Sequence, residues 1–351
     1  WIDTKLHRIP ALADYADRPA EGKGTTWLLV GSDSRAGLTP EQQRLVWLDY
    51  TNFVRAGAKL DGPAKKRLSE INQRLATLFT QFSQNVLADE TDYVLVLESA
   101  ADLAGLPPTL RAAASAAAES RGHQGKWAIL NTRSSMEPFL TYSDRRDLRE
   151  KVWRTYFSRG DNGDARDNNA GITEILLLRG ERAKLIGYPT HAHRRLENSM
   201  AKTPERTLEL MEAVWKPAVA RVHEEVADMQ KIAGPEVTIE PWDYRYYAEK
   251  VRKERYDLDE NEVKPYLQLE KLREGMFWVA GELLGLRFTP VADVPVYHPD
   301  VRVWKVTNAA SELVGLWYFD PYARPGKRSG AWMNAYRSQE RFEREIRTIV
   351  S

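Results

Sequence analysis

The chain has 351 residues, 42% hydrophobic and 29% charged, which is typical of a folded protein of two or three domain-sized units rather than a disordered one. Its 51 basic and 50 acidic residues nearly cancel and are interspersed, so nothing in the charge pattern indicates nucleic acid or an anionic membrane as a partner. Because there is no cysteine, disulfides, thiolate catalysis and cysteine-based zinc sites are excluded.

Residues 1–37 are punctuated by proline and glycine and differ in pattern from the rest of the chain. Their strand candidate is Trp27-Leu-Leu-Val30, which runs into a glycine-bounded loop that carries Asp33 and Arg35. This loop lacks the lysine and the spacing of a phosphate-binding P-loop. We expect it to form a separate N-terminal strand-loop segment.

Residues 38–284 have the patterns of successive long helices. Thr39, followed by Pro40 and Gln42, predicts an N-cap with a capping box, and the cap-plus-proline signature recurs at Thr203. Asp61 is expected to cap the second helix, whose apolar stripe consists of Ile71, Leu75, Leu78, Phe82 and Val86. Further helices are expected at residues 109–121, 143–159, 170–185, 203–232, 242–255 and 267–284, with a short strand or extended piece at 127–130.

From residue 285 the composition changes to short β-rich pieces. Val301–Val306 and Leu313–Phe319 are rich in branched and aromatic residues and are separated by the turn-forming Asn308 and Ser311. The expected fold is therefore mainly α, a multi-helix body with a small antiparallel β-sheet near the C-terminus. The expected domains are residues 1–37, 38–284 and 285–351.

The histidines do not form a zinc motif by their spacing. His223 begins like a helical zinc motif, but Ala227 stands where the second histidine is needed, so a solvated helix face is favoured. His191 and His193 follow a Gly-Tyr-Pro turn, where capping or surface contact at the start of a helix is the simpler interpretation.

His298 lies in the turn-like stretch Tyr297-His-Pro-Asp300 beside the predicted hairpin. A local hydrogen bond to Asp300 is the simpler interpretation, and a ligand-facing role is the alternative. The sequence also has no Gly-x-Ser-x-Gly nucleophile elbow. Residue chemistry alone does not assemble a complete catalytic site in this chain.

Long stretches from about Leu38 onward resemble one family of zinc peptidases. They are Leu68–Phe82, Leu185–Tyr188, Met200–Pro204, Pro241–Tyr244, Tyr247–Glu249, Tyr256–Asp259, Val296–Trp304 and Ser329–Met333. They resemble the thimet oligopeptidase family, and the match is best to its bacterial peptidyl-dipeptidase (dipeptidyl carboxypeptidase) branch. The resemblance implies a helical, two-lobed oligopeptidase-like fold with a channel for short peptides. It also implies removal of C-terminal dipeptides by a zinc-activated water, with a glutamate as general base.

In that family the zinc motif His-Glu-x-x-His follows a few dozen residues after the Gly-Ala-Trp segment, and this sequence stops at Ser351 before reaching it. We therefore expect a cytoplasmic fragment with no catalytic residue and no bound zinc of its own, although the parent family uses zinc. The implied partners are a short peptide substrate and the missing C-terminal zinc-binding half, with no nucleic acid and no membrane. Whether this chain is itself an enzyme is left open.

Gly330, Ala331 and Trp332 match the family strand whose edge pairs with the substrate backbone. Such strand addition gives affinity through main-chain hydrogen bonds without reading side chains, which suits broad specificity. Packing of Trp332 beside a tight glycine turn is the alternative. Tyr297 and His298 are further candidates to line the channel.

The opening segment resembles a different family. Its stretch Gly24–Arg35 is similar to the start of the catalytic domain of LytR-CpsA-Psr proteins, which transfer polymers from polyprenyl-pyrophosphate lipids to cell-wall glycan. By this resemblance Asp33 would help to hold a divalent metal and Arg35 would contact the pyrophosphate. A chimeric or mis-assembled reading frame joined near Leu38 is one hypothesis, and a natural peptidase with a divergent N-terminal segment is the other.

Three functional hypotheses follow. The first is the N-terminal and central part of a zinc peptidyl-dipeptidase, inactive alone. The second is a non-catalytic helical module that binds peptides or a partner chain. The third is a fragment of a LytR-CpsA-Psr-type phosphotransferase, which rests on Asp33 and Arg35 alone.

Overall fold

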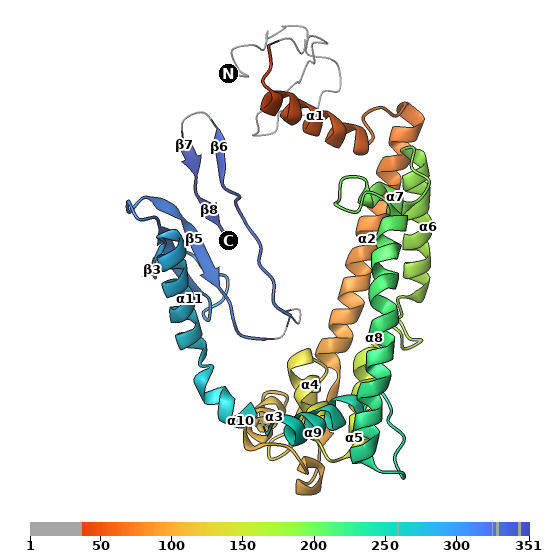
Figure 1. The fold of residues 1–351 in the computed structure, drawn as a ribbon, viewed down its shortest axis with the longest axis vertical. Helices are drawn as coiled ribbons and strands as arrows, with labels where there is room; N and C mark the ends of the chain where they lie inside the picture. Colours follow the sequence, from red (N-terminus) through yellow and green to blue (C-terminus); the bar gives the residue numbers. More distant parts are fainter. Residues whose placement is uncertain (1–36, 258–259, 325, 328–329, 343–344) are drawn as a thin grey trace. The chain divides into compact units, whose positions relative to one another are not determined.

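A computed structural model of the chain describes residues 37–257, 260–324, 326–327, 330–342 and 345–351 (Figure 1). Contacts divide the chain into two units, residues 1–70 and 71–351, which are described separately. The strand expected at Trp27–Val30, together with Asp33 and Arg35, lies outside the described residues. The three-domain division expected from the sequence stays a prediction.

In the first unit, helix α1 (Pro40–Arg55) begins with the predicted capping box. Thr39 Oγ1 accepts a hydrogen bond from the Gln42 amide at 3.3 Å, and Gln42 Oε1 accepts one from the Thr39 amide at 2.9 Å. Helix α2 (Gly62–Asp92) follows, and Asp61 Oδ1 accepts a hydrogen bond from the Ala64 amide at 2.9 Å. Both caps are confirmed.

In the second unit, α2 packs against α6 (Asn169–Leu185). Ile71, Leu75 and Leu78 of the predicted stripe are buried with Ile175 of α6. Phe82, in contrast, is 38% exposed, because α6 begins opposite this turn of α2. Asn168, which precedes α6, donates from Nδ2 to the Phe82 carbonyl at 3.4 Å.

The largest core of this unit joins two short strands to three helices. Strands β1 (Val94–Leu97) and β2 (Trp127–Leu130) pair antiparallel, and α3 (Pro108–Ser120), α4 (Arg133–Tyr142) and α5 (Arg146–Phe157) cover them. The buried side chains are Leu95, Leu97, Leu103, Leu106, Ala114, Ile129, Met136, Phe139, Leu140 and Val152.

The remaining helical elements are η1 (Ala100–Leu103), α7 (His191–Leu196), α8 (Pro204–Ala233), α9 (Tyr244–Tyr256), α10 (Glu260–Val263), η2 (Lys264–Tyr266) and α11 (Leu269–Leu284). The predicted cap of α8 is confirmed, since Thr203 Oγ1 accepts a hydrogen bond from the Arg206 amide at 3.4 Å. The predicted helix start after the Gly-Tyr-Pro turn is also confirmed, with Thr190 as the cap of α7. Within the described ranges, no helix is both long and apolar enough to cross a bilayer.

Near the C-terminus a four-stranded sheet has the order β3 (Arg287–Val291), β4 (Arg302–Thr307), β5 (Leu313–Phe319) and β8 (Ile349–Val350). The predicted β4–β5 hairpin is confirmed, and its turn has Ser311 at φ +65°. The first three strands are antiparallel, but β8 joins β5 in parallel, so the sheet is mixed. A separate hairpin pairs β6 (Glu340–Phe342) with β7 (Glu345–Arg347).

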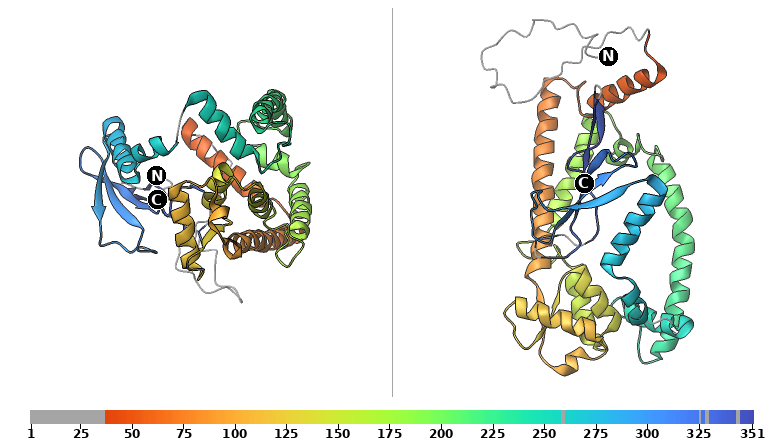
Figure 2. Two further views of the ribbon diagram at one scale, coloured as in Figure 1. Left: turned by 90° about the horizontal axis from the view of Figure 1, so that it is seen from below. Right: turned by 90° about the vertical axis from the view of Figure 1, so that its left-hand side faces the viewer.

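Glycine at position 315 permits the parallel pairing of β8. A Cβ atom at Gly315 would lie 2.3 Å from the Ile349 carbonyl oxygen, so any side chain would push β8 away from β5. On the sheet, α11 packs beside β3, as Figures 1 and 2 show. Phe277 of α11 stacks on Phe288 of β3 with ring centroids 4.2 Å apart, and Trp304 and Trp317 complete this aromatic cluster.

Candidate functional site

Tyr297, one of the predicted channel residues, belongs to a polar cluster centred on Asp320. It lies in the loop between β3 and β4, and its hydroxyl donates to Asp320 Oδ2 at 3.2 Å. Arg324 donates to both carboxylate oxygens at 2.6 and 2.8 Å, and Lys327 Nζ lies 3.0 Å from Oδ1. The Arg324 hydrogen bonds, with Lys327, hold the pKa of Asp320 well below its usual range despite burial. Burial, Asp320 and Tyr336 raise the pKa of Tyr297.

His298 makes the local contact that its sequence context favoured. Its Nδ1 accepts a hydrogen bond from the Asp300 amide at 3.2 Å and lies 3.6 Å from Asp300 Oδ2. The other ring nitrogen therefore carries the proton when the ring is neutral. This arrangement holds the imidazole in the turn and uses one of its two nitrogens.

Gly330, Ala331 and Trp332 lie on an exposed segment outside the assigned strands. Gly330 has φ +108°, a conformation that side chains rarely adopt, and Trp332 is 67% exposed. Within the described residues, no backbone hydrogen bond reaches positions 330–335, and the next one joins the Tyr336 amide to the Val350 carbonyl at 2.7 Å. Within the described ranges, the segment therefore leaves its main-chain donors and acceptors without backbone partners.

The structure brings only some of the predicted residues together. The Tyr297 and Tyr336 hydroxyls interact electrostatically, and Tyr336 packs near Tyr318 of β5 with ring centroids 6.4 Å apart. Tyr318 in turn donates to the Pro295 carbonyl at 3.3 Å, two residues before Tyr297. The Tyr297 loop and the segment after Trp332 thus meet beside β5, while Gly330, Ala331 and Trp332 stay predictions as binding residues.

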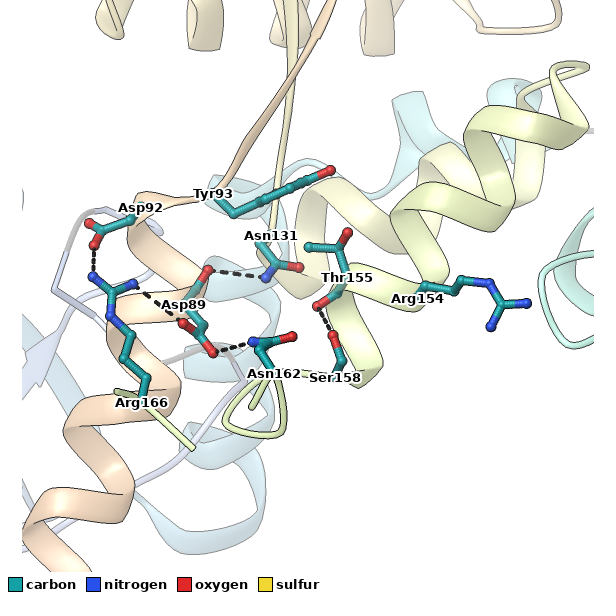
Figure 3. A pocket seen from close by; sticks show the side chains of 9 residues that line it. All are labelled: Asp89, Asp92, Tyr93, Asn131, Arg154, Thr155, Ser158, Asn162 and Arg166. Atoms are coloured by element: carbon teal, nitrogen blue, oxygen red, sulfur yellow. Dashed lines mark hydrogen bonds and ion pairs between the residues drawn. The ribbon is translucent and has the colours of Figure 1, made fainter. Parts of the chain in front are cut away.

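A pocket lies in the helical part, at the end of α2. It is a pocket of about 460 Å³ lined by Asp89, Asp92, Tyr93, Asn131, Arg154, Thr155, Ser158, Asn162 and Arg166 (Figure 3). Figure 3 shows the Asp89 carboxylate between Arg166 and Asn162, with Arg154 pointing away from them. The sequence interpretation missed this pocket, although the turn-rich stretch at residues 160–169 marks its rim.

The polar groups of this pocket are occupied by one another. Asp89 accepts hydrogen bonds from the Gly160 amide at 2.8 Å, from Asn162 Nδ2 at 2.9 Å and from Arg166 Nη1 at 3.3 Å. The Asp89 carbonyl accepts one from Asn131 Nδ2 at 3.1 Å. A carboxylate with its lone pairs so engaged is not available as a general base. The contacts tie the loop after α5 to α2, which is a structural role.

The residues present do not fit a zinc ion. Among the described residues, no group of three or more histidine, aspartate or glutamate side chains could hold a metal. His223 is exposed on α8 without a second histidine one turn on, as expected. Burial lowers the pKa of His191, as do the nearby Arg179, Arg182, Arg194 and Arg195, whose positive charges would also repel a dication. No catalytic step through zinc is therefore assigned to this chain.

Comparison with known proteins agrees with the resemblance inferred from the sequence motifs. The model of peptidase family M3 matches residues 139–350. Dipeptidyl carboxypeptidase of Salmonella typhimurium is 38% identical over 90% of this chain and 47% of its own length, and the Escherichia coli protein of that name is 38% identical over 86% and 45%. Oligopeptidase A of Escherichia coli is 33% identical over 93% of this chain and 49% of its own length.

The chain belongs to peptidase family M3, a family of zinc-dependent peptidases. It spans about half the length of the curated relatives it matches. The resemblance inferred from the sequence motifs is thereby confirmed at the level of the family, and the relatives that the chain matches include dipeptidyl carboxypeptidases.

Proposed function

We propose that this chain is the N-terminal and central part of a peptidyl-dipeptidase, which removes dipeptides from the free C-terminus of short peptides once a zinc-binding part is present. The observation that carries this proposal is the 38% identity to two dipeptidyl carboxypeptidases over nearly the whole chain. The proposed partners are a short peptide substrate and a C-terminal zinc-binding half. The cytoplasmic location expected from the sequence is part of the same proposal.

The contribution of this chain would be to bind the peptide. The segment at residues 330–335 leaves its main chain open within the described ranges, and it runs between the Asp320 cluster and the backbone pairing at Tyr336. A peptide added along it would gain main-chain hydrogen bonds irrespective of its side chains. Tyr297 and His298 would lie on the adjoining loop.

The first test concerns activity. We expect the 351-residue chain alone to release no dipeptide from a short peptide in the presence of zinc, because its sequence contains no His-Glu-x-x-His motif. Mixing it with a polypeptide that carries this motif and the following part of a related enzyme should restore release, measured by mass spectrometry of the products. Zinc-dependent release by the isolated chain, co-eluting with it in chromatography, would contradict the assignment.

The second test concerns the main chain near Trp332. In a strand, successive amides point to opposite sides, so only one of the amides of Ala331 and Trp332 would face the peptide. Proline at that one position should remove a hydrogen bond to the peptide, and proline at the other should not. We expect one of Ala331→Pro and Trp332→Pro to weaken binding of a fluorescent peptide about tenfold by anisotropy. Ala331→Ser and Trp332→Phe, which keep the amides, are the matched controls. Equal affinity in both proline variants would refute strand addition here.

A non-catalytic peptide- or partner-binding module is the second candidate, and the exposed main chain at residues 330–335, without backbone partners in the described ranges, is compatible with it. The mixing experiment separates the two. Peptide affinity without restored release would support the binding module. The phosphotransferase hypothesis rests on Asp33 and Arg35, which lie outside the described residues.

A further inference from the structure

Positively charged side chains gather where α6 meets α7. Arg179 and Arg182 lie one turn apart on α6, His191 is the first residue of α7, and Arg194 and Arg195 follow on α7. We call these five residues the arginine cluster. Burial and the neighbouring guanidinium groups of Arg194, Arg179 and Arg195 lower the pKa of Arg182. Helices α6 and α7 contact each other, which brings these groups together.

Several buried nitrogens of the cluster have no hydrogen-bond partner. Among the described residues, none is a hydrogen-bond partner of Nε of Arg179, Nε of Arg182 or Nδ1 of His191. Arg182 does use one other nitrogen, since Nη1 donates to Asn72 Oδ1 at 3.0 Å. Leaving a buried polar group unsatisfied is costly, so an acceptor that reached these nitrogens would stabilise the folded chain.

The carboxylates near the cluster have partners of their own. Glu174 accepts hydrogen bonds from Nε and Nη2 of Arg74, both at 2.6 Å, and Glu197 accepts one from the Tyr188 hydroxyl at 2.5 Å. Glu205 lies 3.9 Å from His193 Nε2 rather than in the cluster. Glu181 and Arg194 have interactions of their own. Within the described ranges, neither Arg179 nor Arg182 forms an ion pair with a carboxylate.

We propose that the arginine cluster between α6 and α7 binds a phosphate-class oxyanion. The planar guanidinium presents parallel N–H groups that match two oxygens of one oxyanion. Two arginines on α6, together with the cluster residues on α7, therefore suit a tetrahedral dianion better than a halide. The bound anion would supply the acceptors that the buried nitrogens lack and would offset the repulsion among the arginines. This site is separate from the Asp320 cluster and does not depend on the proposed peptidase activity.

The test is thermal unfolding of the 351-residue chain, with sodium phosphate replacing sodium chloride at constant ionic strength. We expect a saturable rise of the Tm, about 4 °C when phosphate reaches twenty times its dissociation constant. Arg179→Met and Arg182→Met should lose this rise. Arg221→Met is the matched control, because Arg221 lies on the exposed face of α8 and pairs with Glu224 and Glu225. Its Tm should rise with phosphate as in the unchanged chain.

Isothermal titration with inorganic phosphate provides a second measurement that does not depend on the variants. Saturable heat with a stoichiometry of one supports the proposal. The anion could be free phosphate or a phosphoryl group on a larger molecule, and titration with O-phosphoserine separates these two sources. A site open to a phosphoryl group binds both ligands, whereas a site for the free ion binds phosphate alone. Absence of saturable heat and of any Tm rise, or a rise unchanged in both Arg179→Met and Arg182→Met, would overturn the proposal.

Discussion

Replacing Asp243 by asparagine is expected to lower the free energy of unfolding by about 3–5 kcal/mol, because it leaves a buried guanidinium without its counter-charge. Asp243 is 0% exposed and Arg149 is 1% exposed. Arg149 Nη2 donates to Asp243 Oδ1 at 2.7 Å, and its other nitrogens donate to the Ser143 carbonyl at 2.7 Å and the Trp242 carbonyl at 3.2 Å. Arg146 donates to the same carboxylate at 2.8 Å.

The effect should be measured by urea denaturation at neutral pH. Glu224→Gln on the exposed face of α8 is the control, with an expected loss below about 1 kcal/mol. Adding Arg149→Met to the Asp243→Asn variant should recover part of the loss, since no buried charge then stands unpaired. A loss below about 1 kcal/mol for Asp243→Asn would show that solvent reaches this pair.

The pH dependence of the same pair has a definite sign. Burial alone would raise the pKa of Asp243, but hydrogen bonds from Arg146 and Arg149 lower it below its ordinary value. Its stabilising contribution is therefore present above the ordinary aspartate pKa of about 3.9 and is lost as the pH falls through the depressed value. The Asp243→Asn variant should lack this acid-dependent part of the stability.

Replacing Phe139 by alanine is the second change with a large expected effect, a loss of about 3–5 kcal/mol in the free energy of unfolding. Phe139 is 0% exposed in the core beneath β1 and β2, where Leu97, Ile129 and Met136 are also buried. These neighbours belong to paired strands and a helix and cannot collapse fully into the cavity.

Phe157→Ala is the matched control for this prediction, because Phe157, at the end of α5, is also a phenylalanine but is 60% exposed. It packs against Trp153 in a tilted arrangement, with ring centroids 4.9 Å apart, so we expect a loss of about 1 kcal/mol. Comparable losses in both variants, measured by urea denaturation, would contradict the assignment of Phe139 to a rigid core.

The elements predicted well from the sequence are those specified by local signals. The caps at Thr39 and Thr203 were predicted because a hydroxyl, a proline and a short spacing suffice to begin a helix. The short strand β1 was not predicted, since Val94–Leu97 becomes a strand only through pairing with β2, at least thirty positions later. Helix α4 was also missed, because Pro138 lies inside it.

The same distinction holds for the sites. The turn at His298 follows from neighbouring residues, and its contact with Asp300 agrees with the simpler sequence interpretation. The Asp320 cluster joins Tyr297 to a carboxylate 23 residues away across a loop and two strands, which no periodicity reveals. The arginine cluster likewise depends on how α7 turns back on α6 after Gly187, where the chain has φ +87°.

For the peptide binding proposed above, the Asp320 cluster has a consequence for the entropy. The segment that carries Gly330 and Trp332 is tethered near both ends, through Arg324 and Lys327 to Asp320 and through the Tyr336 amide to the Val350 carbonyl. A chain anchored at two points samples fewer conformations than one anchored at a single point. A ligand that orders the segment would then lose less conformational entropy, so Asp320 would strengthen binding without touching the peptide.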